Sequence, residues 1–149
     1  MQSDTGTIAL PSPNHIGVVV KDVDETTKFL SSVGGLGPWQ TFEYSPHKDN
    51  MIVGEPFTLK MAITKLGSTV LELLQPVEGN SIWAQALETK GEGIHHIAFS
   101  VSNWEEMVSK LQEQGSRMVA GSAFGDNRWC YFDTKPGDII VELMDNFEL

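Results

Sequence analysis

Two segments 81 residues apart carry the same pattern: a His, an Ile, a small residue, and then apolar or small side chains. The first segment begins at His15 and the second at His96. Each is typical of a β-strand, because β-branched and aromatic residues favour strands. Each also runs into an amphipathic, acid-capped helical segment that ends at a Gly 19 residues after its His, at Gly34 and Gly115. The chain therefore looks like one supersecondary unit present twice.

The end of each copy also repeats. Val70–Leu74 and Ile140–Met144 are apolar strands with Glu72 and Glu142 at their centres. Between start and end, each copy has the order β-α-β-β-β, which predicts an α+β protein made of two paired βαβββ modules.

The segments predict the following organisation. Residues 1–12 form a flexible arm, and residues 13–145 form a single domain with a peripheral acidic tail at 145–149. Asp22 or Asp24 caps a helix whose apolar stripe is Phe29, Leu30 and Val33. Within the domain, module one spans about 13–78, a connecting helix about 80–90, and module two about 93–145. Short strands are expected at 39–44 and 117–120, with loops at 45–56, 75–79 and 121–128.

A hairpin is expected where Gly67-Ser68 separates two apolar runs, since two-residue turns of this kind connect antiparallel strands. The turn sets the pairing: Leu66 opposite Thr69, Ile63 opposite Glu72, and Met61 opposite Leu74. Met61 and Glu72 therefore share one face of the hairpin.

Composition excludes several classes of function. Twenty acidic against ten basic residues, net charge −10, argue against nucleic acid or an anionic membrane surface as a partner. No apolar run approaches the ~18 residues of a membrane span. Residues 1–12 lack a basic flank followed by an apolar block, so a secretory signal is not expected there. A single cysteine, Cys130, suits a reducing cytoplasm and is expected to be a small hydrophobic strand residue.

The two glutamates need an explanation, because a buried unpaired carboxylate costs several kcal/mol. Glu72 and Glu142 make this demand at matching positions, and His15 and His96 recur at matching positions too. Two imidazoles and two carboxylates from a duplicated unit suit one divalent ion such as Zn, Ni, Co, Mn or Fe. Alignment of the repeats selects His96 as the ligand over His95, which is expected to support it.

The chain resembles the vicinal oxygen chelate superfamily, which includes glyoxalase I, extradiol dioxygenases, bleomycin-resistance proteins and methylmalonyl-CoA epimerases. The epimerases are the most similar branch. The most specific match is Gly-Glu-Gly-Ile-His-His-Ile-Ala-Phe at 91–99, and weaker matches lie at 14–17, 71–76 and 141–143. The resemblance implies a cup-shaped sheet around a metal held by His15, Glu72, His96 and Glu142. It also implies a homodimer.

In this superfamily the metal binds substrate oxygens and stabilises an oxyanion, which in the isomerases and lyases is an enolate. A nearby carboxylate moves the proton next to the carbonyl. By that resemblance Glu142 is the first candidate for the base and Glu72 the second. Aromatic and apolar side chains are expected to line the substrate cavity: Trp39, Tyr44, Met61, Trp129 and Tyr131. The strand at 57–66 contains no acid, although the epimerases would have a second carboxylate there.

Three functions therefore remain open. The first is an epimerase-like isomerase or lyase acting on a small molecule, with an acyl-CoA among the candidates. The second is a glyoxalase I-like lyase or other metalloenzyme of the superfamily acting on a bulkier non-CoA molecule. The third is a metal-free binding protein of the resistance type, which the complete set of four ligands disfavours. An extradiol dioxygenase is disfavoured because it would use two His and one Glu.

Overall fold

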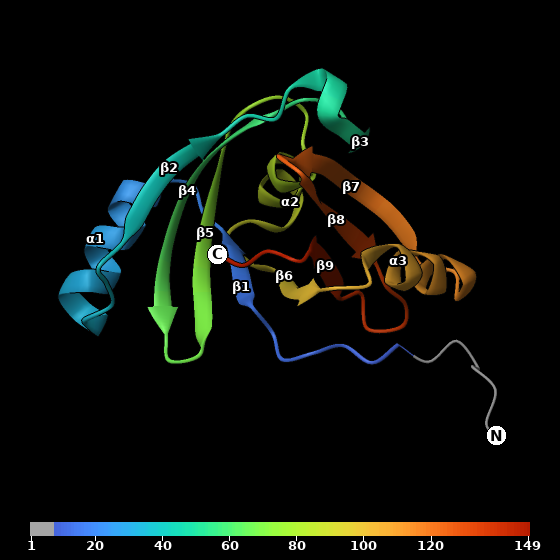
Figure 1. The fold of residues 1–149 in the computed structure, drawn as a ribbon. Helices are drawn as coiled ribbons and strands as arrows, with labels where there is room; N and C mark the ends of the chain where they lie inside the picture. The colour runs from blue at the N-terminus through green and yellow to red at the C-terminus, as the bar shows by residue number, and fades with distance from the viewer. Residues whose placement is uncertain (1–7) are drawn as a thin grey trace.

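The computed structural model describes residues 8–149 as one strongly curled sheet with two helices on its outside (Figure 1). A third helix, residues 82–90, packs on the inner side of the curl. The strands are β1 (His15–Val19), β2 (Gln40–Tyr44), β3 (Met51–Val53), β4 (Thr58–Leu66), β5 (Thr69–Glu78), β6 (Gly93–Val101), β7 (Arg117–Phe124), β8 (Asn127–Asp133) and β9 (Ile140–Asp145). The helices are α1 (Val23–Gly34), α2 (Ile82–Lys90) and α3 (Trp104–Glu113), and Lys48–Asn50 form a short 3-10 turn.

The strand order shows the duplication directly. The sheet runs β2-β4-β5-β1-β6-β9-β8-β7-β3. Apart from β3 at the far edge, the four strands on each side of the β1–β6 junction have the same order counted from the centre. β1 pairs in parallel with β5 and β6 pairs in parallel with β9, while β1 and β6 pair antiparallel with each other. The predicted α+β fold of two βαβββ units in a cup-shaped sheet is confirmed.

β3 was not predicted. It comes from the segment 45–56, which was expected to be a loop, and it pairs with β7 at the far edge of the other half. The sequence gives little sign of it because only Met51, Ile52 and Val53 form the strand. β3 therefore covers an edge strand that would otherwise expose unpaired backbone groups.

The predicted register of the central hairpin is confirmed. Leu66 lies opposite Thr69, Ile63 opposite Glu72, and Met61 opposite Leu74. Two predicted loops were wrong, however, because the strands continue through them. β5 extends through Pro76 to Glu78, and β7 and β8 extend to a tight turn at Gly125, so most of 121–128 is strand.

The predicted stripe of α1 was also wrong in part. The helix begins at the cap Asp22, whose side chain accepts from the backbone N–H of Glu25. Val23 is fully buried and sets the inward face, which continues at Leu30. Phe29 and Val33 are 60% and 70% exposed, because they lie on the face turned away from the sheet.

The core has three parts. One cluster fills the concave side of the sheet and includes Trp83, Trp129 and Tyr131. A second lies between α3 and the convex side, and a third lies under α1. Cys130 belongs to the second cluster, is fully buried in β8, and has a pKa raised by burial. This is the small hydrophobic role expected of it.

The two ends of the chain differ from each other. Residues 1–7 of the predicted arm lie outside the described residues, while Ile8 packs against the cluster under α3. The tail 145–149 is not peripheral, because Phe147 and Leu149 pack against the concave-side cluster. Figure 1 marks the C-terminus between the two halves of the sheet.

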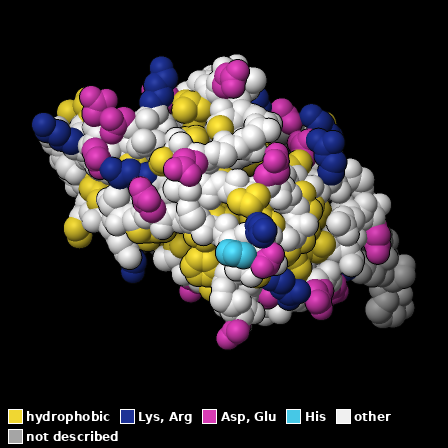
Figure 2. Space-filling model, turned by 90° about the horizontal axis from the view of Figure 1, so that it is seen from above, with side chains coloured by type: hydrophobic (Ala, Val, Ile, Leu, Met, Phe, Trp, Pro, Cys, Tyr) yellow, Lys and Arg dark blue, Asp and Glu magenta, His cyan; other side chains and the backbone are white. Residues whose placement is uncertain are grey.

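The described part of the chain contains no helix that is both long and apolar enough to cross a membrane. On the face seen in Figure 2, Lys and Arg side chains lie among Asp and Glu side chains, without one broad basic surface.

Candidate metal centre

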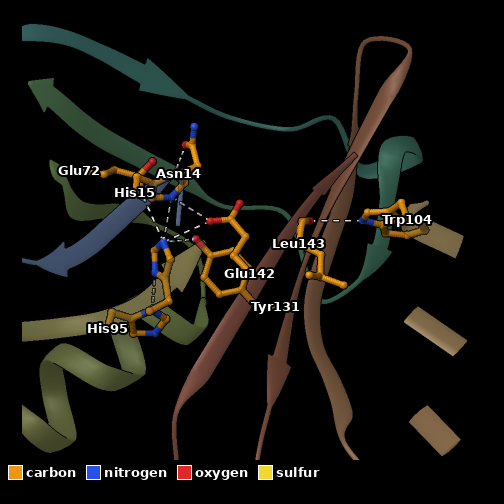
Figure 3. Close-up of polar contacts among 9 residues, drawn as sticks. Asn14, His15, Glu72, His95, Trp104, Tyr131, Glu142 and Leu143 are labelled. Carbon is orange, nitrogen blue, oxygen red and sulfur yellow. Dashed lines mark hydrogen bonds and ion pairs between the residues drawn. The ribbon is translucent and has the colours of Figure 1, made fainter. Parts of the chain in front are cut away.

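Four consecutive strands in the middle of the sheet supply the predicted ligands. Glu72 comes from β5, His15 from β1, His96 from β6 and Glu142 from β9. All four side chains point to the concave side and converge, as the close-up in Figure 3 shows for three of them by label. One ligand atom from each lies within 4.8 Å of those of the other three.

The register explains why the four meet. Gly17 on β1 lies between Glu72 and His96 on its neighbouring strands. In the adjacent row, Ala98 on β6 lies between His15 and Glu142. The small residue of each His-Ile-small motif therefore faces the His of the other copy. A Cβ on Gly17 would lie 2.0 Å from Cε1 of His96, so only glycine leaves room for this ring.

The distances are those of a tight polar cluster. Oε1 of Glu142 lies 3.1 Å from Nε2 of His15 and 3.2 Å from Nε2 of His96. Oε1 of Glu72 lies 3.4 and 3.3 Å from the same two nitrogens. The two Nε2 atoms are 3.3 Å apart. Both imidazoles and both carboxylates thus aim the atoms that can ligate a metal at a common point.

The four groups are deeply buried, and their neighbours shift the pKa of each toward its charged form. His15 and His96 are at most 1% exposed, Glu72 is 3% and Glu142 6% exposed. Burial opposes the charged form of Glu72, but the adjacent His15 and His96 lower its pKa to about 2. Burial likewise opposes charge on His15, while the two glutamates raise its pKa to about 10. The pKa of His96 is raised and that of Glu142 lowered for the same reasons.

The donor set fits a divalent cation. Oε1 of Glu72 is buried and accepts no hydrogen bond of normal geometry from the described residues. Leaving such an oxygen unsatisfied is costly. A divalent cation would satisfy it and would balance the two carboxylate charges, and two imidazoles with two carboxylates suit borderline metals.

The residue before each histidine holds that ring in place. Nδ1–H of His15 donates to Oδ1 of Asn14 at 2.8 Å, and Nδ1 of His96 contacts Nδ1 of His95 at 3.0 Å (Figure 3). Burial and the charge of His96 lower the pKa of His95 to about 3, which keeps it a neutral acceptor. Outer contacts of this kind orient metal-binding histidines with Nε2 toward the ion. His95 thus lies where its expected supporting role requires. The sequence analysis did not single out Asn14, although Asn14 holds the position in the first copy that His95 holds in the second.

A mostly apolar cavity of about 100 Å³ opens beside the cluster. Four of the five predicted lining residues are there: Tyr44, Met61, Trp129 and Tyr131. Others that the sequence did not single out are Trp83 from α2, Phe124 from the tip of β7, and Phe147 and Leu149 from the tail. Phe124 and Phe147 stack with ring centroids 5.4 Å apart.

Trp39 does not line this cavity, which corrects the prediction. Its ring packs against the cluster under α1, on the convex side of the sheet, and its Nε1–H donates to Ser31 at 3.0 Å. Trp39 lies just before β2, and the sequence does not show to which side its ring turns there.

The cavity holds few charged groups. Among the described residues that line it, the only acids are Glu72 and Glu142, and there is no Lys or Arg. Met61 occupies the position on β4 where an epimerase-type second carboxylate was considered, and Lys60 points to the other side, where it binds Asp24.

Comparison with known proteins identifies the family. The sequence profile of the glyoxalase/bleomycin resistance protein/dioxygenase superfamily matches residues 14–132. The chain belongs to this superfamily. The match spans most of both modules, including three of the four clustered residues, which confirms the resemblance read from the repeats.

The individual proteins compared with this chain are less than 30% identical to it. The uncharacterized protein YqjC of Bacillus subtilis (strain 168) is 29% identical over 106 residues, covering 71% of this chain and 69% of that protein. Methylmalonyl-CoA epimerase from Mycobacterium tuberculosis is 21% identical with a TM-score of 0.70, covering 95% of this chain and 93% of that one. A hypothetical protein, BH1468 from Bacillus halodurans C-125, is 22% identical with a TM-score of 0.67, covering 93% of this chain and 96% of that one. At these identities the solved structures show a shared fold.

Proposed function

We propose that this superfamily member is a divalent-metal-dependent isomerase or lyase that moves a proton on the carbon next to a carbonyl group. The observation that carries the proposal is the convergence of His15, Glu72, His96 and Glu142 beside a mostly apolar cavity that three of them line. When bound there, a divalent cation supplies positive charge that stabilises negative charge developing on a carbonyl oxygen.

Each residue of the site has its own proposed role in the reaction. His15 and His96 would hold the cation, with Asn14 and His95 fixing the two rings. Glu142 is the proposed base, because it lines the cavity and can accept a proton from a carbon beside the carbonyl. Glu72 is the second candidate. The apolar walls exclude water, which strengthens every electrostatic interaction inside the cavity.

Epimerase-like chemistry on an acyl-CoA is the first specific candidate. Proteins with this fold include a methylmalonyl-CoA epimerase in complex with methylmalonyl-CoA and NH4+, 23% identical to this chain. A glyoxalase I-like or related lyase acting on a bulkier non-CoA molecule is the second. The aromatic walls of the cavity and Met61 in place of an acid on β4 favour this second candidate.

The two candidates are separated by hydrogen exchange. Metal-loaded protein is incubated with racemic methylmalonyl-CoA in deuterated water, and deuterium at the α-carbon is followed by mass spectrometry. Exchange supports the epimerase-like reaction. No exchange with metal in place removes that candidate, and hemithioacetals and other carbonyl compounds with aromatic groups are then screened.

Replacing Glu142 tests the proposed base. Glu142→Gln keeps the size and an oxygen ligand but removes the group that accepts a proton. We expect turnover to fall by roughly 10²–10⁴-fold, the usual contribution of a general base, with a smaller loss of bound metal. Glu72→Gln is the matched variant, and a larger loss of turnover there would exchange the two roles. Loss of turnover only in proportion to lost metal would make Glu142 a ligand alone.

A further inference from the structure

Tyr131 lies beside the cluster but is not one of the four converging ligands. It is 3% exposed on β8, directly opposite Glu142 in the sheet, and its side chain lines the same cavity. Its hydroxyl lies 3.3 Å from Nε2 of His96, as the dashed contacts in Figure 3 show. The phenol therefore reaches the point where the ligand atoms meet.

The contact with His96 cannot persist in a loaded site. Nδ1 of His96 is engaged by His95, so Nε2 is the nitrogen left to hold a cation. Once it does so, Nε2 has neither a proton nor a lone pair to offer the phenol. A buried hydroxyl without a partner is costly, so Tyr131 needs another group to bond.

Besides His96, the described polar side chains that interact with the phenol are Trp83 and Glu142. Trp83 can only donate, and Glu142 is one of the four proposed ligands. The rings near Tyr131 are Trp83, Trp129 and the two adjacent histidines, at centroid distances of 4.6 to 5.8 Å. The indole N–H of Trp83, in the same cavity wall, also makes no hydrogen bond of normal geometry with the described residues. Tyr131 and Trp83 both line the cavity, where a ligand with oxygen atoms would supply an acceptor.

We propose that Tyr131 is a further catalytic residue, whose hydroxyl donates a hydrogen bond to the substrate's carbonyl oxygen as that oxygen gains negative charge. The inference rests on the proposed function, since it takes the cluster to be the metal site. A donor fixed in a buried site stabilises the charged form of the substrate oxygen more than the neutral form, so it lowers the barrier to proton removal.

The test compares wild type with Tyr131→Phe, which removes only the hydroxyl. Both proteins are loaded with Co²⁺, and the metal content and visible absorption are recorded. Acetohydroxamate, a small anion with two adjacent oxygens, is then titrated by calorimetry. We expect equal Co²⁺ content and spectra, and about tenfold weaker acetohydroxamate binding by the variant, a typical loss for one hydrogen bond to a charged group.

Trp104→Phe is the matched control. It removes the Nε1–H that donates to the carbonyl of Leu143, a buried hydrogen bond on the opposite side of the sheet (Figure 3). We expect acetohydroxamate affinity equal to wild type. A second readout needs no variant: the near-ultraviolet tyrosine band of the Co²⁺-loaded wild type should shift to longer wavelength when acetohydroxamate is added.

The outcomes are distinct. Unchanged affinity in Tyr131→Phe, or no shift of the tyrosine band, overturns the role of Tyr131 and leaves the proposed function intact. Loss of Co²⁺ from Tyr131→Phe would show that the hydroxyl supports His96 instead of the substrate. That result also overturns the proposed role of Tyr131. Wild type that binds none of Co²⁺, Zn²⁺, Ni²⁺, Mn²⁺ and Fe²⁺ overturns the proposed function, and this inference with it.

Discussion

Gly17 shows how a single position determines the site. It lies between Glu72 and His96 in the sheet, and the ring of His96 occupies the space where a side chain would begin. The equivalent position in the other copy, Ala98 opposite His15, accommodates a methyl group. The two copies are therefore related but not identical in how closely the histidine approaches its neighbouring strand.

Gly17→Ala should displace His96 and weaken metal binding. The added Cβ would lie 2.0 to 2.5 Å from three atoms of the ring, far inside van der Waals contact, so the ring must move. Metal content after dialysis checks this, with circular dichroism to show that the fold is kept. Ala98→Gly is the control, expected to cost about 0.5–1 kcal/mol of stability but to retain metal. Normal metal content in Gly17→Ala would show that the ring moves without consequence.

The adjacent histidines should behave differently. His96→Ala removes a ligand and should abolish metal binding. His95→Ala and Asn14→Ala remove only the contacts to Nδ1 of the two ligand rings, so each should weaken metal affinity by about 10- to 100-fold. Competition titration with a chromophoric chelator measures all three. If His95→Ala lost metal and His96→Ala kept it, the assignment of the two residues would be reversed.

The elements differ in how far the sequence determines them. The hairpin β4–β5 was predicted in the correct register because Gly67-Ser68 sets the turn and every later pair follows from it. The helix α1 was found, but its inward face was not, since Phe29 and Val33 made a convincing apolar pair. β3 was not predicted because three residues carry no measurable periodicity, and because its partner β7 lies in the other half of the chain.

The tail forms part of the cavity wall. Phe147 and Leu149 turn toward the concave side while Asn146 and Glu148 face solvent. Its acidic composition suggested a peripheral segment, and only the path of the chain after β9 shows otherwise. Phe147 stacks on Phe124 and both line the cavity, so the tail and the β7–β8 turn together narrow the approach to the cluster.

Phe147→Ala should therefore open the cavity to small solutes. Trp83 and Trp129 line it and are at most 5% exposed. We expect stronger quenching of tryptophan fluorescence by acrylamide in this variant than in wild type. Glu148→Ala is the neighbouring control on the solvent side and should match wild type. Equal quenching in all three proteins would show that the tail does not limit access.

At the scale of the whole molecule, the duplication is what made the site predictable. Four ligands from strands far apart in sequence could be assigned because each has a counterpart at the same position of the other copy. The cavity was only partly predictable, since Trp83, Phe124 and Phe147 enter from a connecting helix, a turn and the tail, which lie outside the repeated strands. The homodimer and the cytoplasmic location remain predictions.

Duplication also accounts for the outer contacts. Asn14 and His95 precede the two ligand histidines, and both engage Nδ1 of the ring that follows. The same backbone geometry thus supports both rings with different side chains. The candidate metal centre depends on both halves at once, because each half supplies one imidazole and one carboxylate.

The most direct test of this account is the metal content of the purified protein, measured by mass spectrometry after incubation with Zn²⁺, Co²⁺, Ni²⁺, Mn²⁺ or Fe²⁺ and dialysis. The account predicts one ion per chain for at least one of these metals, and loss of that ion in the double variant His15→Ala/His96→Ala with its fold intact. Wild type that retains none of the five metals, or a double variant that retains the ion, would contradict it.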